Sequence, residues 1–147
     1  CGVLDRSIAA GHFIVPTAAY RDEGTSYHYA PASDYIDIPT AAELSAAFDA
    51  ISMPHVQGKT WTTDAIYRET RDGLAKRRAE GCITVEMECA SLMAVGQFRK
   101  KAVYQFLYAE DCLDSVEWDP RIMGKQPATA YEGYLDVALE CAIRVKG

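Results

Sequence analysis

Residues 82–92 read Cys82-Ile83-Thr84-Val85-Glu86-Met87-Glu88-Cys89-Ala90-Ser91-Leu92, and this stretch decides the fold of the chain. The short apolar run from Ile83 to Val85 predicts a buried strand. Helical spacing follows in the apolar residues Leu92, Met93, Val95 and Phe98. The stretch therefore places two carboxylates, Glu86 and Glu88, where a strand ends and a helix begins.

The two carboxylates and the methionine between them suit a ligand that carries hydroxyl groups. In an open α/β sheet, the crevice outside the carboxyl ends of the strands is where ligands bind. A carboxylate can accept hydrogen bonds from both hydroxyls of a vicinal diol, and Met87 offers a soft apolar surface to a sugar ring. Alternatively, Glu86 and Glu88 only stabilise the helix start, where negative charge is favourable. The spacing alone leaves both interpretations open.

The composition excludes several classes of protein. The chain has 147 residues, of which 49% are hydrophobic, and this is enough for one domain with a core. Its formal net charge of −6 argues against a nucleic-acid partner. No apolar run approaches the roughly 20 residues that a membrane span needs. We therefore expect a single domain over residues 1–147, in the cytoplasm, with neither nucleic acid nor membrane as partner.

The cysteines and histidines indicate neither disulfides nor a metal site. The three histidines are scattered without the spacing of zinc ligands, so we expect no metal. The cysteines are odd in number and form no Cys-x-x-Cys pair, which is typical of free thiols in a reducing compartment. They are Cys1, Cys82, Cys89, Cys112 and Cys141.

Strand and helix signals alternate along the chain. Strands are expected at 12–17, 56–67, 83–85 and 102–108, with helices at 40–51, 68–80, from the glutamates to about 100, and at 129–145. Pro16 marks an edge or an end of the first strand. The alternation predicts an α/β fold, a mixed and mostly parallel central sheet flanked by helices. The last helix is expected to face inward with Tyr131, Leu135, Ala138, Leu139, Ala142 and Ile143.

A second pair of acids, Glu110 and Asp111, follows the strand expected at 102–108. If that strand neighbours the strand at 83–85, both pairs of acids line one crevice. Clustered and buried acids raise one another's pKa, and a carboxyl that stays protonated near neutral pH is a competent general acid. Carboxylate pairs also hold metals or cap helices, but no third cluster of hard ligands favours a metal here.

The sequence Val85-Glu86-Met87-Glu88, followed by a helix of small residues, resembles the ribose-binding signature of the nucleoside phosphorylase superfamily. The resemblance is to the branch of the superfamily that includes the hexameric purine nucleoside phosphorylases and the uridine phosphorylases. The segment Arg21-Asp22-Glu23-Gly24-Thr25-Ser26-Tyr27-His28-Tyr29-Ala30-Pro31 is most similar to the uridine phosphorylase type. The likeness runs over essentially the whole chain. It implies a nucleoside phosphorylase-like domain, of which this chain is the C-terminal portion without the first strands of the sheet.

The resemblance implies a sugar site around the two glutamates. Met87 would lie against the ribose and Glu88 would bind its hydroxyls. Val85 and Glu86 would contact the base and the edge of the ribose. All four are therefore expected to bind substrate.

The resemblance also implies a base site. Ile66, in Thr62-Thr63-Asp64-Ala65-Ile66-Tyr67, would stack on the base, and Cys1-Gly2 matches a Ser/Thr-x-Gly turn beside it. Asp111 would be the catalytic general acid at purine N7. Members specific for uridine read uracil with a Gln-x-Arg pair. Thr70-Arg71-Asp72 stands in that place here, so a purine is favoured over a pyrimidine.

The expected function is phosphate-dependent cleavage of the N-glycosidic bond of a nucleoside, with phosphate as co-substrate and no cofactor. Family members hold phosphate with a glycine-rich loop and arginines that precede the region matched here. Two alternatives stay open: hydrolysis by water, as in methylthioadenosine/adenosylhomocysteine nucleosidases, and an inactive truncated remnant that binds a nucleoside or only self-associates. The expected partners are nucleoside, phosphate and further copies of the chain, in a dimer or a hexamer.

Overall fold

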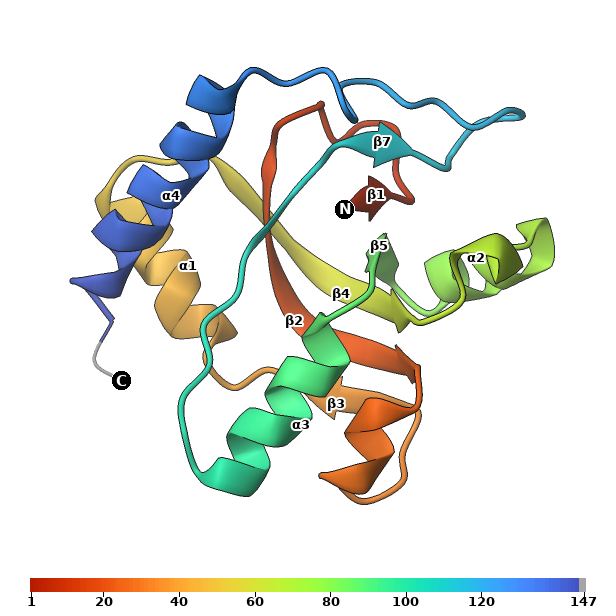
Figure 1. The fold of residues 1–147 in the computed structure, drawn as a ribbon, viewed down its shortest axis with the longest axis horizontal. Coiled ribbons are helices and arrows are strands. Elements are labelled where there is room, and N and C mark those ends of the chain that lie inside the picture. The colour runs from red at the N-terminus through yellow and green to blue at the C-terminus, as the bar shows by residue number, and fades with distance from the viewer. Residues whose placement is uncertain (146–147) are drawn as a thin grey trace.

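A mixed sheet forms the centre of the computed structural model, which describes residues 1–145 (Figure 1). The strand order is β3-β2-β4-β5-β1-β7, and β6 pairs with β2 outside this path. The pairs β2–β4, β4–β5 and β1–β7 are parallel. The predicted α/β fold is thereby confirmed. The strands are β1 Gly2–Val3, β2 Phe13–Asp22, β3 Tyr35–Asp37, β4 His55–Thr63, β5 Cys82–Glu86, β6 Leu107–Tyr108 and β7 Asp111–Cys112.

Within residues 1–145, four α-helices flank the sheet: α1 Ala41–Ala50, α2 Arg71–Ala79, α3 Cys89–Arg99 and α4 Ala128–Ala142. Helices α1, α3 and α4 contribute buried side chains to one shared core cluster, whereas α2 packs Leu74 into a separate cluster on the other face (Figure 1). Two short 3₁₀ helices, η1 Thr25–His28 and η2 Ile66–Arg68, lie in the connections. Within residues 1–145, the helices lack the length and apolar character that a bilayer crossing requires.

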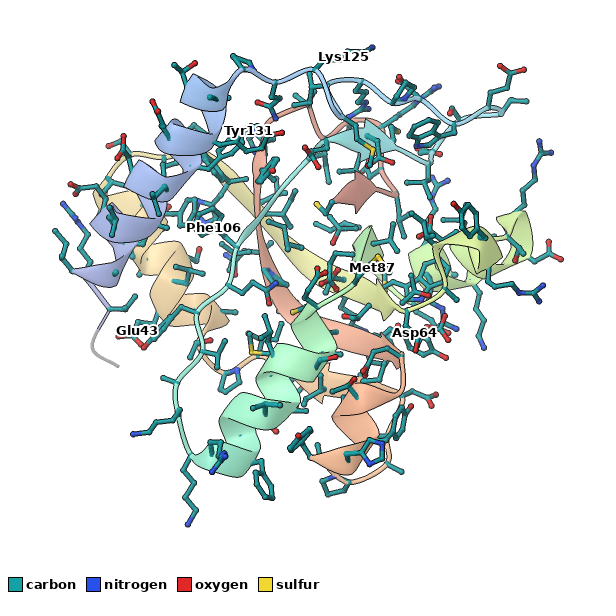
Figure 2. All side chains as sticks on the ribbon, viewed as in Figure 1. Glu43, Asp64, Met87, Phe106, Lys125 and Tyr131 are labelled. Carbon is teal, nitrogen blue, oxygen red and sulfur yellow. The ribbon has the colours of Figure 1, made fainter. Side chains whose placement is uncertain are left out.

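Aromatic rings hold the larger core cluster together. The ring of Phe13 in β2 meets those of Phe48, Phe106 and Tyr134 edge to face, with centroids 5.4 to 5.6 Å apart. Such pairs contribute roughly 0.5–1.5 kcal/mol each beyond the area they bury. Phe13 thereby ties the sheet to α1, to the segment before β6 and to α4, and Figure 2 shows Phe106 in this position.

The prediction of a strand at 102–108 is wrong for most of these residues. Only Leu107 and Tyr108 pair, antiparallel to Ile14 and Phe13 of β2. Residues 101–106 carry no strand ladder and are held by side chains such as Phe106. The apolar side chains of this segment, among them Val103 and Phe106, pack on the aromatic core. They give the apolar run of a strand without a strand partner. Asp111 therefore lies in β7 and not at the end of the predicted strand.

Pro16 does not mark the edge or the end of a strand, as its sequence context had suggested. The strand β2 runs through it to Asp22 in the interior of the sheet. Proline is tolerated there because β6 pairs only with residues 13–14 and β3 only with residues 18–20. On the other side of β2, the register with β4 shifts between Pro16 and Ala19. Pro16 is the last residue paired with β4 before this shift, opposite Gly58, and on the other flank neither β3 nor β6 pairs with it.

The predicted inward face of the last helix was also wrong. Leu135, Leu139 and Ile143 expose 59%, 59% and 76% of their surface, and Val137 and Cys141 are buried instead. Figure 2 shows Tyr131 at the start of this helix. Apolar residues occupy so much of the circumference of α4 that helical spacing cannot tell which stripe meets the core.

A buried arginine fixes the segment after β2. Arg21, which is 3% exposed, donates from Nε to Ser26 Oγ at 2.8 Å and from Nη1 to the Pro31 carbonyl at 2.6 Å. Its Nη2 donates to the Ala30 carbonyl, and its guanidinium lies 4.1 Å from the centroid of the Tyr27 ring. The polar segment of residues 21–31 is therefore an ordered loop wrapped around one cation.

We expect Arg21→Met to lower the free energy of unfolding by about 2 kcal/mol, because it leaves buried acceptors without donors while keeping the apolar stem. Urea denaturation measures this. Arg99→Lys, an exposed charge-conserving change at the end of α3, is the control and should shift stability by less than about 0.5 kcal/mol. Equal stability of the two variants would contradict the role given to Arg21.

Candidate functional site

The candidate site forms where β5, β1 and β7 lie side by side. Gly2 of β1 pairs with Val85 of β5 on one side and with Asp111 of β7 on the other. The sequence predicts that the two strands carrying the acids are neighbours in the sheet. In the structure they are not neighbours. They are joined through β1, which brings the first residues of the chain between the sugar-side glutamates and Asp111.

Gly2 is required here by close packing. A Cβ atom at this position would lie 2.5 Å from Leu113 Cδ1, 3.1 Å from Val85 Cγ1 and 3.2 Å from Asp111 Oδ1. The lack of a side chain allows the three strands to approach and leaves Asp111 Oδ1 beside the backbone of β1. The sequence matched this residue to a turn, whereas in the structure it begins a strand.

Glu86 is a buried structural carboxylate. Its Oε1 accepts hydrogen bonds from Thr62 Oγ1 at 2.6 Å and Thr60 Oγ1 at 3.3 Å, and its Oε2 accepts from the backbone N–H groups of Glu88 and Cys89 at 2.8 and 2.6 Å. Burial raises the pKa of Glu86, and these hydrogen bonds partly offset that effect. For this residue the contacts favour the helix-start alternative. The predicted contact of Glu86 with a ribose stays a prediction.

Met87 and Glu88 differ from Glu86 in being open to solvent. Met87 is 44% exposed, and Figure 2 shows it where β5 gives way to α3. Glu88 occupies the N-cap position of α3, yet its carboxylate makes no capping hydrogen bond there. Because Glu86 satisfies the N–H groups at this helix start, the carboxylate of Glu88 is left available to a ligand.

One cavity of about 240 Å³ brings all the residues singled out in the sequence together. Glu69, Glu110, Leu113 and Met123 complete its wall. The thiol of Cys1 donates to the Tyr108 carbonyl at 3.2 Å. The sequence-predicted members of the wall are Cys1, Gly2, Ile66, Val85, Glu86, Met87, Glu88 and Asp111.

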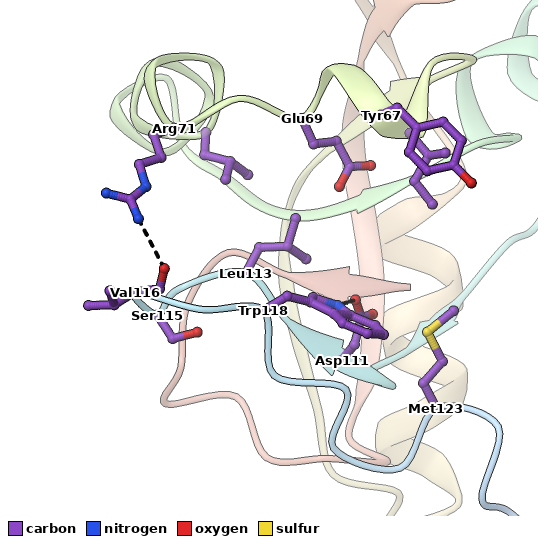
Figure 3. A pocket seen from close by; sticks show the side chains of 11 residues that line it. Tyr67, Glu69, Arg71, Asp111, Leu113, Ser115, Val116, Trp118 and Met123 are labelled. Atoms are coloured by element: carbon purple, nitrogen blue, oxygen red, sulfur yellow. Dashed lines mark hydrogen bonds between the residues drawn. The ribbon is translucent and has the colours of Figure 1, made fainter.

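A second cavity, of about 390 Å³, adjoins the first and shares Ile66, Glu69, Asp111, Leu113 and Met123 with it. Figure 3 shows Trp118 lying across Asp111 at its floor. The indole N–H donates to Asp111 Oδ2 at 2.7 Å. The sequence reasoning missed Trp118 as a site residue, although a tryptophan in the polar loop after Asp111 was a usable signal.

Glu69 was also missed, because a single acid between a short loop and a helix carries no pattern. It enters both cavities from the segment between η2 and α2. Burial, and then the negative charge of Asp111, raise the pKa of Glu69 to about 7. A carboxyl group that titrates near neutral pH thus lies opposite Asp111. Among residues 1–145, no cluster of histidine, cysteine and acidic side chains is placed to hold a metal ion.

Comparison with known proteins identifies relatives of this arrangement. The profile of the phosphorylase superfamily matches residues 1–129. A guanosine phosphorylase of Halorubrum lacusprofundi is 30% identical over 101 residues, which is 66% of this chain and 41% of that protein. An uncharacterized protein of Acanthamoeba polyphaga mimivirus is 25% identical over 116 residues, 77% of this chain and 44% of the viral protein.

Solved structures share the fold. A purine nucleoside phosphorylase from Toxoplasma gondii superposes with a TM-score of 0.76 at 19% identity, covering 96% of this chain and 59% of that one. An AMP nucleosidase from Bacteroides thetaiotaomicron superposes with a TM-score of 0.70 at 24% identity, covering 97% and 56%. The chain thus spans about half the length of the proteins it matches.

The contrast between the two glutamates is testable. We expect Glu86→Ala to lower the free energy of unfolding by about 2–3 kcal/mol, because it removes a helix cap and leaves buried donors without an acceptor. Glu88→Ala is the matched control and should change stability by less than about 0.5 kcal/mol. Thermal and urea unfolding of both variants measure this. Similar losses in the two variants would show that Glu88 is structural as well.

Proposed function

The chain belongs to the phosphorylase superfamily, and on that premise we propose that it forms the nucleoside-binding part of an enzyme that cleaves the N-glycosidic bond of a purine nucleoside with phosphate. One observation carries the proposal. A single cavity is lined both by Met87 and Glu88, which suit a sugar, and by Asp111 and Ile66, which suit a base.

The sugar half of the cavity is assigned to Met87 and Glu88. The thioether of Met87 would pack on the ribose ring. The two oxygens of Glu88 would accept hydrogen bonds from the vicinal hydroxyls. Glu86 would act through position alone, because its four hydrogen bonds hold the turn that presents these two residues.

The base half is assigned to Ile66, Val85, Gly2 and Asp111. Ile66, which is half exposed, would stack on the base, and the bare backbone of Gly2 leaves room beside it. The guanosine phosphorylase similarity favours a purine. Asp111 in the wall of the cavity agrees with this proposal, because its carboxyl group could donate to purine N7. The segment at Thr70-Arg71-Asp72 lacks the uracil-reading pair.

In the proposed reaction the bond between C1′ and N9 stretches, and the sugar becomes cation-like. Its electron pair moves onto the purine, which takes up a proton, while a phosphate oxygen bonds to C1′. Glu88 would hold the sugar in the geometry of attack. Stabilising the departing base accelerates the step because this interaction strengthens in the transition state. Assembly of several copies into a dimer or a hexamer is part of the proposal.

Product analysis decides between the phosphorylase and the nucleosidase alternative, which the fold of the AMP nucleosidase also accommodates. We expect ribose 1-phosphate from a purine nucleoside in phosphate buffer and no turnover without phosphate, measured by ³¹P NMR and chromatography. Free ribose that forms at the same rate in both buffers would establish hydrolysis. A protein that binds the nucleoside without turning it over would support the binding remnant.

We expect Asp111→Asn to lower kcat/KM for a purine nucleoside by about 100-fold or more, the size typical of a lost general acid. The loss should be much smaller for nucleosides with chemically activated leaving groups, which depart without a proton. Steady-state kinetics on both substrates measure this, with Asp136→Asn on the exposed side of α4 as control. Equal losses on both substrates would contradict the role of Asp111.

A further inference from the structure

A third cavity, of about 460 Å³, adjoins the 390 Å³ cavity and extends the row that begins at the sugar-side glutamates. The two larger cavities share five wall residues: Arg71, Leu74, Leu113, Ser115 and Val116. Of these, only Leu113 also lines the 240 Å³ cavity. In Figure 3, Arg71 and Val116 lie at one end of the 390 Å³ cavity, and Asp111 and Met123, which belong to the 240 Å³ cavity as well, lie at the other. The three cavities therefore follow one another, with the 390 Å³ cavity in the middle.

The two ends of this row differ in charge. Acids line the 240 Å³ cavity: Glu69, Glu86, Glu88, Glu110 and Asp111. The charged side chains on the wall of the 460 Å³ cavity are Arg6, Arg71, Arg78 and Asp114. Three guanidinium groups thus stand against one carboxylate, in a chain whose formal net charge is −6. The far end of the row therefore attracts an anion.

The hydrogen bonds of this cavity show which arginines are free to bind a ligand. Asp114 accepts from Arg78 Nη1 at 2.6 Å through Oδ1 and from the backbone N–H of Arg6 at 3.1 Å through Oδ2. The guanidinium of Arg6 has no hydrogen bond or ion pair with any other side chain or carbonyl of residues 1–145. Arg71 donates from Nη2 to the Val116 carbonyl at 3.2 Å, which holds it at the junction of the two cavities and leaves its other N–H groups. Arg6 and Arg71 are therefore the two cations with donors to spare.

A guanidinium group with free donors suits a carboxylate or a phosphate. The phosphate that attacks C1′ is a poor candidate for the 460 Å³ cavity, because its oxygen must reach the sugar. The sugar is assigned to Met87 and Glu88, and neither of them lines the 390 Å³ or the 460 Å³ cavity. The anion that these arginines suit is therefore carried on the base side of the substrate.

We propose that the 460 Å³ cavity binds a carboxylate-bearing arm of the base, so that the substrates include purine nucleosides with a dicarboxylate substituent. This inference rests on the proposed nucleoside cleavage, which places the base at Asp111. The exocyclic group at C6 lies next to N7 on the purine, so an arm on the C6 nitrogen would enter the 390 Å³ cavity past Trp118. Its two carboxylates would then meet two separate cations, Arg6 and Arg71.

Two purine bases test the charge preference without any turnover, because neither has a glycosidic bond. They are N6-(1,2-dicarboxyethyl)adenine and the corresponding diamide, which has nearly the same shape and no charge. We expect the dicarboxylate to bind about tenfold or more tightly than the diamide at about 50 mM salt, measured by isothermal titration calorimetry. In about 0.5 M salt the preference should shrink to less than about threefold, because salt screens charges that are open to solvent.

Arg6→Gln is the decisive variant, because the side chain of Arg6 is exposed and its loss removes no contact within the fold. It should lower the preference for the dicarboxylate by about fivefold or more, and Arg71→Gln should do the same. Arg99→Gln, which removes an exposed guanidinium from α3, is the matched control and should leave the preference unchanged.

Equal binding of the two bases, or a preference that Arg6→Gln leaves intact, would overturn the proposal. A higher KM for phosphate in Arg6→Gln, with no change in the preference between the bases, would overturn it in favour of a site for the co-substrate. Failure of the proposed function looks different. A protein that prefers the dicarboxylate but cleaves no nucleoside would contradict the cleavage alone, whereas cleavage without the preference would contradict the dicarboxylate site alone.

Discussion

The buried carboxylate of Glu86 is the constraint on which the site depends. It joins β4, through Thr60 and Thr62, to the first turn of α3, through the N–H groups of Glu88 and Cys89. A charged group can be buried in this way only when its oxygens are satisfied. Because the Glu86 carboxylate caps the N-terminus of α3, the Glu88 carboxylate is not needed as a cap. Of the two glutamates, Glu86 therefore stabilises the turn and Glu88 is exposed on it.

The layered α/β fold followed from the sequence because it rests on local signals. The run Ile83 to Val85 and the helical spacing after Glu88 are properties of neighbouring residues. The predictions that proved wrong concern which segments pair or pack with each other. Residues 102–106 have the apolar run of a strand, yet their apolar side chains pack on the aromatic core around Phe13. Pro16 lies in the middle of the sheet because β3 and β6 pair with β2 on either side of it and leave that flank open, and no local pattern reports that.

The candidate site shows the same division. The eight residues chosen from the sequence line one cavity, because strand ends gather at one edge of a sheet. The order of the strands that carry them differs from the predicted order, since β1 lies between β5 and β7. Glu69 and Trp118 were missed because each acts through a contact distant in sequence: Glu69 faces Asp111 across the cavity, and Trp118 binds it. Such contacts depend on three-dimensional placement and leave no mark in residue spacing.

The segment of residues 101–106 has a consequence for how the molecule comes apart. It is fastened by rings, with Phe106 against Phe13 and Phe48, and by few main-chain bonds. Hydrophobic contacts weaken on cooling, whereas a ladder of backbone bonds resists local opening. Residues 101–106 should therefore unfold locally at low temperature before the sheet does. Because this segment runs directly into β6 and β7, its loosening would reach the carboxyl groups of the cavity first.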